Sequence, residues 1–195
     1  MTFVVVLESH AMRSAVEDAI RTPYRDRYGA RLASFPDVLV AEATLWGTIE
    51  CAAGIRFGHQ RFFLEHYLDT PVEIALEQRF GRRIDRCRTV EVCNLVAARR
   101  GRSRPFVRRI VEFVETADAE WAVFTATKPL RALLRQENLN MIELARAEQM
   151  RVPDPHDWGT YFEHDPRVMA VNRSAVFQSR RVFAEPAPVA AAALA

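Results

Sequence analysis

A strand–helix–strand unit in the middle of the chain constrains the fold most. Residues 89–96 and 121–127 are short, apolar and rich in β-branched or aromatic residues, as buried strands are. Between them, residues 105–117 carry apolar side chains at helical spacing, with Pro105 suited to a first turn. Two strands joined through one helix pair in parallel within one sheet. The chain therefore requires a sheet with a helix packed on its face.

The remaining segments predict further strands and helices on both sides of this unit. A proline after residue 22 is expected to end the first helix, and Gly47 to split a hairpin. Expected strands are 2–7, 38–46, 48–57, 158–162 and 168–177; expected helices are 9–21 (capped by Ser9), 61–68, 72–80 and 129–136. Residues 138–150 suit either a helix or a loop followed by a helix. The order predicts an α+β fold with a mixed sheet.

Length and composition limit the classes of protein. A chain of 195 residues, 49% hydrophobic, favours a single domain over 1–180, with a disordered Ala/Pro-rich tail at 181–195. A formal net charge of +2 gives no general signal for binding nucleic acid. Three cysteines without CxxC spacing argue against disulfides and zinc and favour the cytoplasm. The apolar run at the start is too short for a signal peptide or a membrane span, so no stable membrane insertion is expected.

One carboxylate, Glu91, interrupts the apolar strand 89–96. Alternation puts Glu91, Cys93 and Leu95 on one face of that strand. Glu91 is either an edge or salt-bridged residue, or a general base whose pKa is raised in a cleft. Cys93 is either a nucleophile or, as cysteines more often are, a small buried hydrophobe.

The strand runs into an arginine-rich loop, AARRGRSR, just before the helix. Exposed backbone N–H groups and a helix start form an anion site suited to phosphate, and the arginines add donors. Those arginines are Arg99, Arg100, Arg102 and Arg104. An ordinary solvated loop is the alternative, because neither GxxxxGK[ST] nor GxGxxG is present. The five histidines lack ligand spacing, so no metal site is predicted.

Four phrases together resemble the thermostable hemolysin family of bacteria: RFFLEHYLDTPVE, VEVCNLV, WAVFTATKPLRALL and WGTYFEHDPRVMAV. The resemblance covers Ser9 to Phe177. Cys93 departs from it, since the family usually has glycine there. The family in turn is similar to GNAT-type acyltransferases, close to the acyl-homoserine-lactone synthases and N-acyl amino acid synthases. The resemblance implies that strands 89–96 and 121–127 splay apart to admit the pantetheine arm of an acyl donor.

The resemblance also implies roles for individual residues. The donor phosphate would bind the loop at Arg99, Arg100, Gly101, Arg102 and Ser103, although RRGRS matches only part of the R/Q-x-x-G-x-G/A pattern. Glu91 would accept a proton from the attacking amine, and Asn94 stands where the lactone synthases have arginine. The N–H groups of Leu95 and Val96 would stabilise the oxyanion. The segment YRDRYGARL resembles the one that folds over the substrates, which makes Tyr24, Arg25 and Arg27 candidates for the acceptor or acyl pocket. From the strand 121–127 itself, Thr125 and Thr127 either line the same cleft or merely suit a strand.

These inferences predict an acyltransferase that moves an acyl group from an acyl-CoA or acyl carrier protein thioester to a small amine or amino-acid-like acceptor by direct aminolysis. The donor is then a substrate, and no tightly bound cofactor is expected. Two alternatives are a non-catalytic domain that binds acyl thioesters and a membrane-active hemolysin. A homodimer is the default expectation.

Overall fold

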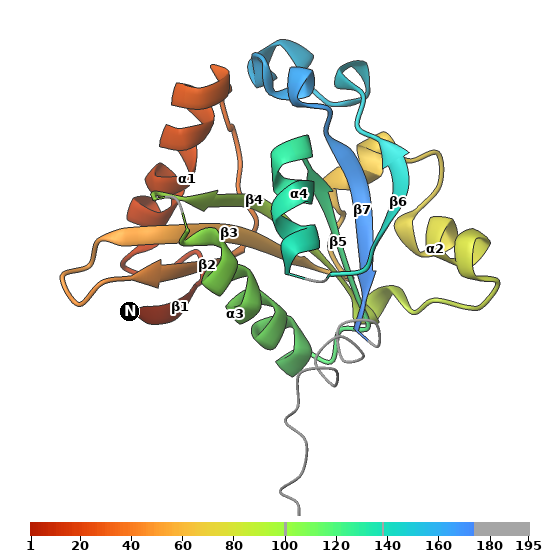
Figure 1. Ribbon diagram of the computed structural model, residues 1–195, viewed down its shortest axis with the longest axis horizontal. Helices are drawn as coiled ribbons and strands as arrows, with labels where there is room; N and C mark the ends of the chain where they lie inside the picture. Colours follow the sequence, from red (N-terminus) through yellow and green to blue (C-terminus); the bar gives the residue numbers. More distant parts are fainter. Residues whose placement is uncertain (100, 138, 174–195) are drawn as a thin grey trace, which may run out of the picture.

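The computed structural model describes residues 1–99, 101–137 and 139–173 (Figure 1). A mixed sheet of seven strands, in the order β1-β2-β3-β4-β5-β7-β6, forms its centre. The strands are β1 (Thr2–Val6), β2 (Val38–Ala43), β3 (Ile49–Phe57), β4 (Thr89–Ala97), β5 (Trp121–Ala126), β6 (Met141–Arg146) and β7 (Arg167–Asn172). Among the described strands, only β4 and β5 pair in parallel; the other neighbours are antiparallel. The predicted α+β fold with a mixed sheet is confirmed.

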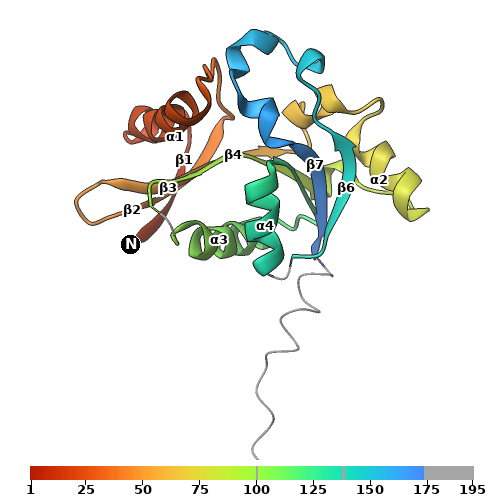
Figure 2. The same ribbon diagram turned by 45° about the horizontal axis from the view of Figure 1, so that its top comes forward.

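Helices cover both faces of this sheet (Figure 2). The helices are α1 (Arg13–Tyr28), α2 (Val72–Phe80), α3 (Ser103–Thr116) and α4 (Lys128–Gln136), with a 3₁₀ helix η1 at Phe63–Tyr67. Alternate residues of the strands supply two cores. Trp121 and Val123 pack toward α2 and η1, whereas Phe124 packs toward α3 and α4. Helix α1 packs on the same face as α2, against β1, β2 and β3.

Strands β4 and β5 pair only at their beginnings. Their register runs from Thr89 opposite Trp121 to Glu91 opposite Val123, and no pairing continues along the described strands beyond it. The β4 edge is therefore open from Val92 onward, as the predicted splay requires.

Asn94 breaks the alternation of β4 at this point. Its φ is +54°, and the pairing with β3 shifts register between Ala52 and Gly54. This bulge turns Leu95 onto the face of Val92, where both pack against the α3 side. The predicted grouping of Leu95 with Glu91 and Cys93 is therefore wrong, because strict alternation does not survive a bulge.

The first helix differs from the prediction at both ends. It begins at Arg13 rather than after Ser9, and the Nδ1 atom of His10 accepts a hydrogen bond from the Met12 N–H. It also continues through Pro23 to Tyr28 and ends at Gly29, which has φ +67°. The ring contacts that the last turn makes with Tyr161 offset the backbone hydrogen bond lost at the proline.

Two predictions in the C-terminal third are also wrong. Residues 141–146 form strand β6 and not a helix, because pairing with β7 overrides the helical preference of their Met, Glu, Leu and Ala residues. Residues 158–162 form 3₁₀ turns rather than a strand, since Gly159 (φ +50°, ψ −126°) reverses the chain between them. The last predicted strand is β7, 167–172; its expected continuation to 177 and the tail at 181–195 lie outside the described residues.

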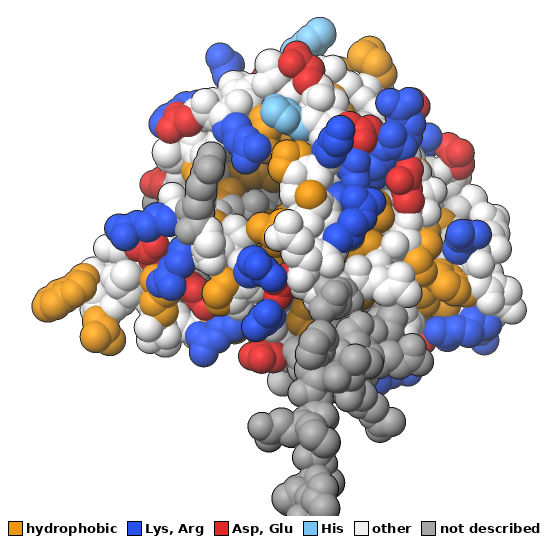
Figure 3. Space-filling model, viewed as in Figure 1, with side chains coloured by type: hydrophobic (Ala, Val, Ile, Leu, Met, Phe, Trp, Pro, Cys, Tyr) orange, Lys and Arg blue, Asp and Glu red, His pale blue; other side chains and the backbone are white. Residues whose placement is uncertain are grey.

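The hairpin at Gly47 is confirmed as β2–β3, and hydrophobic side chains protrude at its tip (Figure 3). Leu45 and Trp46 are more than nine-tenths exposed there. In the described part of the chain, no helix has the length and apolar character needed to cross a membrane.

Gly159 docks the 3₁₀ segment onto the end of α1, and we expect Gly159→Ala to lower stability by at least about 2 kcal/mol. An added Cβ would lie 1.9 Å from the Tyr28 carbonyl oxygen, which accepts a 2.8 Å hydrogen bond from the Thr160 N–H. Thermal unfolding would measure the loss. Gly47→Ala is the control, because Gly47 also has positive φ (+80°) but open space around it. Equal melting temperatures for the two variants would contradict the expectation.

Candidate active site

A cavity of about 320 Å³ lies between the splayed strands and helices α3 and α4. Its walls are mainly apolar side chains from these four elements and the segment after α4: Val92, Leu95, Val107, Val111, Phe124, Leu130, Leu133, Leu134 and Leu139. The face of the molecule is hollowed between α1 and α4, and hydrophobic side chains line the hollow (Figure 3). An apolar cavity of this kind suits a hydrocarbon chain.

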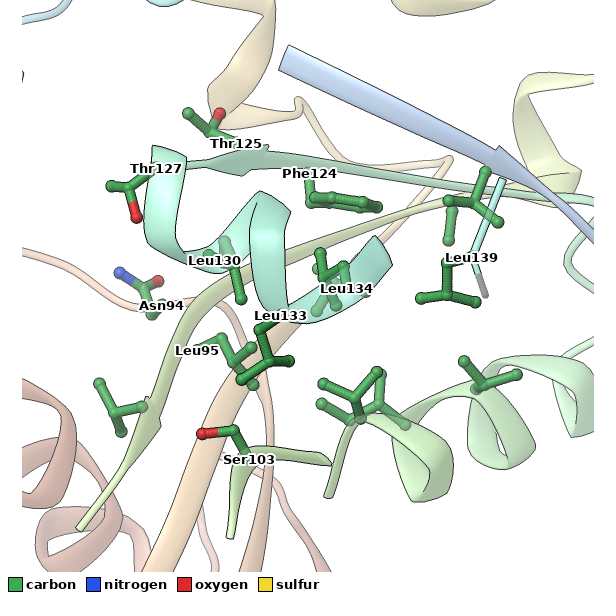
Figure 4. A pocket seen from close by; sticks show the side chains of 18 of the residues that line it. Asn94, Leu95, Ser103, Phe124, Thr125, Thr127, Leu130, Leu133, Leu134 and Leu139 are labelled. Atoms are coloured by element: carbon green, nitrogen blue, oxygen red, sulfur yellow. The ribbon is translucent and has the colours of Figure 1, made fainter. Parts of the chain in front are cut away.

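Polar groups gather at one end of this apolar cavity (Figure 4). Asn94, Thr125 and Thr127 lie together there, while the leucines of α4 line the interior. Thr127 is buried. The cavity therefore has a polar end and an apolar interior, which fits a ligand with a polar head and an apolar tail.

A second cavity, of about 340 Å³, lies on the other face of the sheet. It contains aromatic, polar and charged side chains from η1, β3, β4 and the 3₁₀ turns near Trp158. Five residues belong to the walls of both cavities: Tyr24, Cys93, Asn94, Thr125 and Tyr161. The two cavities therefore meet where β4 and β5 stop pairing.

Glu91 lies in the wall of the second cavity and is 2% exposed. Its Oε2 accepts hydrogen bonds from Arg56 Nη1 (2.9 Å) and the Phe63 N–H (2.8 Å), and its Oε1 accepts one from the Leu64 N–H (2.9 Å). Burial raises the pKa of the Glu91 carboxyl, and Arg56 and the two N–H groups offset only part of this rise. The sequence left a salt bridge and a carboxylate in a cleft as alternatives for Glu91. In the structure Glu91 is both salt-bridged to Arg56 and part of a cavity wall.

Cys93 and the neighbouring tyrosines are held in their neutral forms. Burial raises the pKa of the Cys93 thiol, and the nearby Glu91 raises it further. Its sulfur lies 3.5 Å from Arg56 Nη1. A thiol of this kind is a poor nucleophile, which agrees with the small-hydrophobe interpretation. Burial likewise raises the pKa of the Tyr24 and Tyr161 phenols, so both keep their protons as potential donors.

The arginine-rich loop runs from the end of β4 to the start of α3. Gly101 has φ +84°, and Ser103 begins α3 and lines the first cavity. Arg99 is largely exposed and lies 3.7 Å from Glu50, while the Arg102 side chain contacts Met1. Arg100 lies outside the described residues. The Ser103 and Arg104 N–H groups occupy the first helical turn, where no intrahelical acceptor exists.

The structure brings together only part of the predicted acceptor set. Tyr24 and Thr125 lie at the junction of the cavities, and Thr127 and Arg27 line the first one. Arg25 lines neither; it is exposed and pairs with Asp26 at 2.9 Å.

Sequence reasoning missed two groups of residues. The first is the apolar wall from α3 and α4; its only signal was amphipathic spacing, which any core-facing helix shares. The second is the set around Glu91, above all Arg56, which lies directly opposite Glu91 in the β3–β4 register. No local motif marks that pairing.

The model of the thermostable hemolysin family matches residues 6–177. The chain belongs to this family. The thermostable hemolysin match spans strands β2 to β7, the four described helices and both cavities, so the predicted resemblance over Ser9 to Phe177 is confirmed. No curated protein matched the sequence of this thermostable hemolysin family member.

Solved structures show where else the thermostable hemolysin fold occurs. The acyl-homoserine-lactone synthase LasI superposes with a TM-score of 0.60 at 7% identity, over 91% of this chain and 94% of LasI. FeeM, an N-acyl amino acid synthase from uncultured soil microbes, superposes with a TM-score of 0.60 at 10% identity, over 90% of this chain and 99% of FeeM. MesI, a CoA-dependent acyl-homoserine-lactone synthase, superposes with a TM-score of 0.57 at 16% identity, over 97% of this chain and 99% of MesI. At these identities the likeness shows a shared fold, and N-acetyltransferase structures share it too.

Proposed function

We propose that the protein is an acyltransferase that transfers an acyl group from a thioester to the amine of a small acceptor. The observation that carries this proposal is the meeting of two unlike cavities at the splay between β4 and β5. One cavity suits an acyl chain and the other a polar acceptor. The similarity of the fold to acyl-homoserine-lactone and N-acyl amino acid synthases supports the same assignment.

The donor enters in this proposal along the open edge of β4. Its acyl chain occupies the apolar cavity, and its phosphate lies at the start of α3, near Gly101 and Ser103. The helix dipole favours an anion there. Both an acyl-CoA and an acylated carrier protein present this phosphopantetheine chemistry, and the reaction assay below compares them.

The chemical step proposed is direct aminolysis. The neutral amine attacks the thioester carbon, a C–N bond forms, the C–S bond breaks, and the thiol leaves. Glu91 takes the proton that the amine loses, directly or through water, because a carboxyl with a raised pKa is a suitable acceptor. Backbone N–H groups at Leu95 and Val96, on the part of β4 that no longer pairs with β5, stabilise the oxyanion. Asn94, at the polar end of the acyl cavity, orients the reacting groups.

Thiol release with defined donors tests this function. Purified protein would be mixed with butyryl-, octanoyl-, dodecanoyl- or palmitoyl-CoA, or the matching acyl carrier proteins, and with a set of small amines. Mass spectrometry would identify the acylated product. We expect release that requires both donor and amine. Donor binding without release would instead identify a non-catalytic domain that binds acyl thioesters. The absence of both binding and release would reject the proposal.

A further inference from the structure

We propose that the second cavity takes an α-amino acid with an apolar side chain, holding its carboxylate on Arg56 and its amine near Glu91. This inference rests on the acyltransferase function proposed above and names the class of acceptor. It follows from a fixed pair of opposite charges in the cavity wall.

Arg56 and Glu91 form that pair. Their side chains join through a 2.9 Å contact, with Arg56 16% exposed and Glu91 2% exposed, and both line the second cavity. An α-amino acid carries its own two charges on a single carbon. It can therefore lie beside the pair with its carboxylate against the guanidinium and its ammonium against the carboxylate. A simple amine would offer a partner to Glu91 but would give Arg56 no partner besides Glu91.

Arg56 keeps donors for such a ligand. Its Nη1 serves Glu91 and, at 3.5 Å, the sulfur of Cys93. Within the described ranges, its Nε and Nη2 atoms have no protein acceptor. A planar guanidinium with two free N–H-bearing nitrogens binds a carboxylate well. Arg56 contacts Cys93, which lines both cavities. The guanidinium of Arg56 therefore lies close to the proposed position of the thioester.

The rest of the wall suits an apolar side chain. Phe63, Trp158 and Tyr161 form a continuous aromatic surface, with ring centroids 5.4 Å apart at each step. Arg31, Asp154 and Asp157 also line this cavity, so its wall carries charges of both signs and does not select a side chain of one charge.

The reaction then balances without a further reagent. The ammonium of the bound amino acid gives up one proton, and the amine nitrogen attacks the thioester carbon. The C–N bond forms, the C–S bond breaks, and the second amine proton passes to Glu91 while the thiolate takes one from solvent. An N-acyl amino acid, a free thiol and one net proton result, with no oxidation or reduction.

Acceptors that differ only at the carboxylate test the inference on the wild-type protein. With one acyl-CoA, thiol release would be compared for phenylalanine, phenylalaninol and phenethylamine. We expect kcat/KM for phenylalanine to be highest by roughly ten- to a hundredfold, the value of a charge-assisted hydrogen bond. Equal or faster release with the two amines that lack the carboxylate would overturn the inference and leave the acyltransferase function standing. No release with any of the three, from a donor that reacts with other amines, would overturn the inference alone; no release from any donor with any amine would overturn both.

Arg56→Gln adds a second readout. The variant should lose the preference for phenylalanine over phenethylamine, whatever its absolute rates, because the ratio cancels general damage to the site. Arg79→Gln is the control; Arg79 is exposed at the end of α2, away from both cavities, and this variant should keep the wild-type ratio. A wild-type ratio in Arg56→Gln would contradict the assignment.

Discussion

Glu91→Gln should fold and should lose acyl transfer by about 100- to 10,000-fold, the usual contribution of a positioned general base. The amide has nearly the shape of the carboxylate but cannot take the proton of the amine. It also places an N–H₂ group where the Phe63, Leu64 and Arg56 donors converge. We therefore expect a stability loss of about 1–3 kcal/mol in addition to the kinetic effect. Thiol release and thermal unfolding measure the two separately.

Glu65→Gln is a closely matched control for the structural part of that effect. The Glu65 carboxylate likewise accepts hydrogen bonds from two backbone N–H groups, those of Phe62 and Val72, and from the guanidinium of Arg86. It lines neither cavity. We expect this variant to lose similar stability and to keep its activity. If both variants lost activity equally, Glu91 would be a structural anchor rather than a base.

The pH dependence gives an independent test of the same role. A raised pKa means that Glu91 takes up a proton at a higher pH than an ordinary glutamate, whose value is 4.5. Activity should therefore fall with decreasing pH, with its midpoint above 4.5, since the protonated carboxyl accepts no proton. The residual rate of Glu91→Gln should not show this fall at low pH, the acid limb of the pH profile. The same limb in the variant would assign the titration to another group.

Several elements of the fold were predictable because the sequence patterns that specify them are local. The β4–α3–β5 unit and the β2–β3 hairpin each depend on residues close in sequence, and both are confirmed. Helix α1 and strand β6 were mispredicted because distant partners decide them. Aromatic contacts with Tyr161 carry α1 past Pro23, and pairing with β7 holds 141–146 in a strand.

The candidate site shows the same division. Glu91 could be singled out because a carboxylate in an apolar strand is unusual, and the loop at Gly101 because arginines gather there. Arg56 could not, since a register between two strands brings it to Glu91. The effect of the bulge at Asn94 on Leu95 was equally hidden, because non-glycine residues rarely adopt positive φ and no composition signals it.

The acyl cavity yields the second prediction of large effect, at Leu133. This half-buried side chain of α4 points into the cavity in Figure 4. Leu133→Trp should fill space that a long chain requires. Transfer from palmitoyl-CoA should fall by at least about tenfold while transfer from butyryl-CoA changes little, because each methylene that loses its place costs about 1–3 kcal/mol. Leu133→Ala should move the preference toward longer chains. Rates across the four acyl-CoAs measure the shift.

Leu144→Trp separates a specific effect on the cavity from general damage by a bulky residue. Leu144 is also half-buried, but it lies on β6 and packs against the core around Trp121, outside both cavities. It should lower the melting temperature without changing the order of preference among donors. If Leu133→Trp lowered all four rates by the same factor, as a folding defect would, the acyl chain would not occupy this cavity. A change confined to the long donors would place the chain between α3 and α4, with its thioester at the splay of β4 and β5.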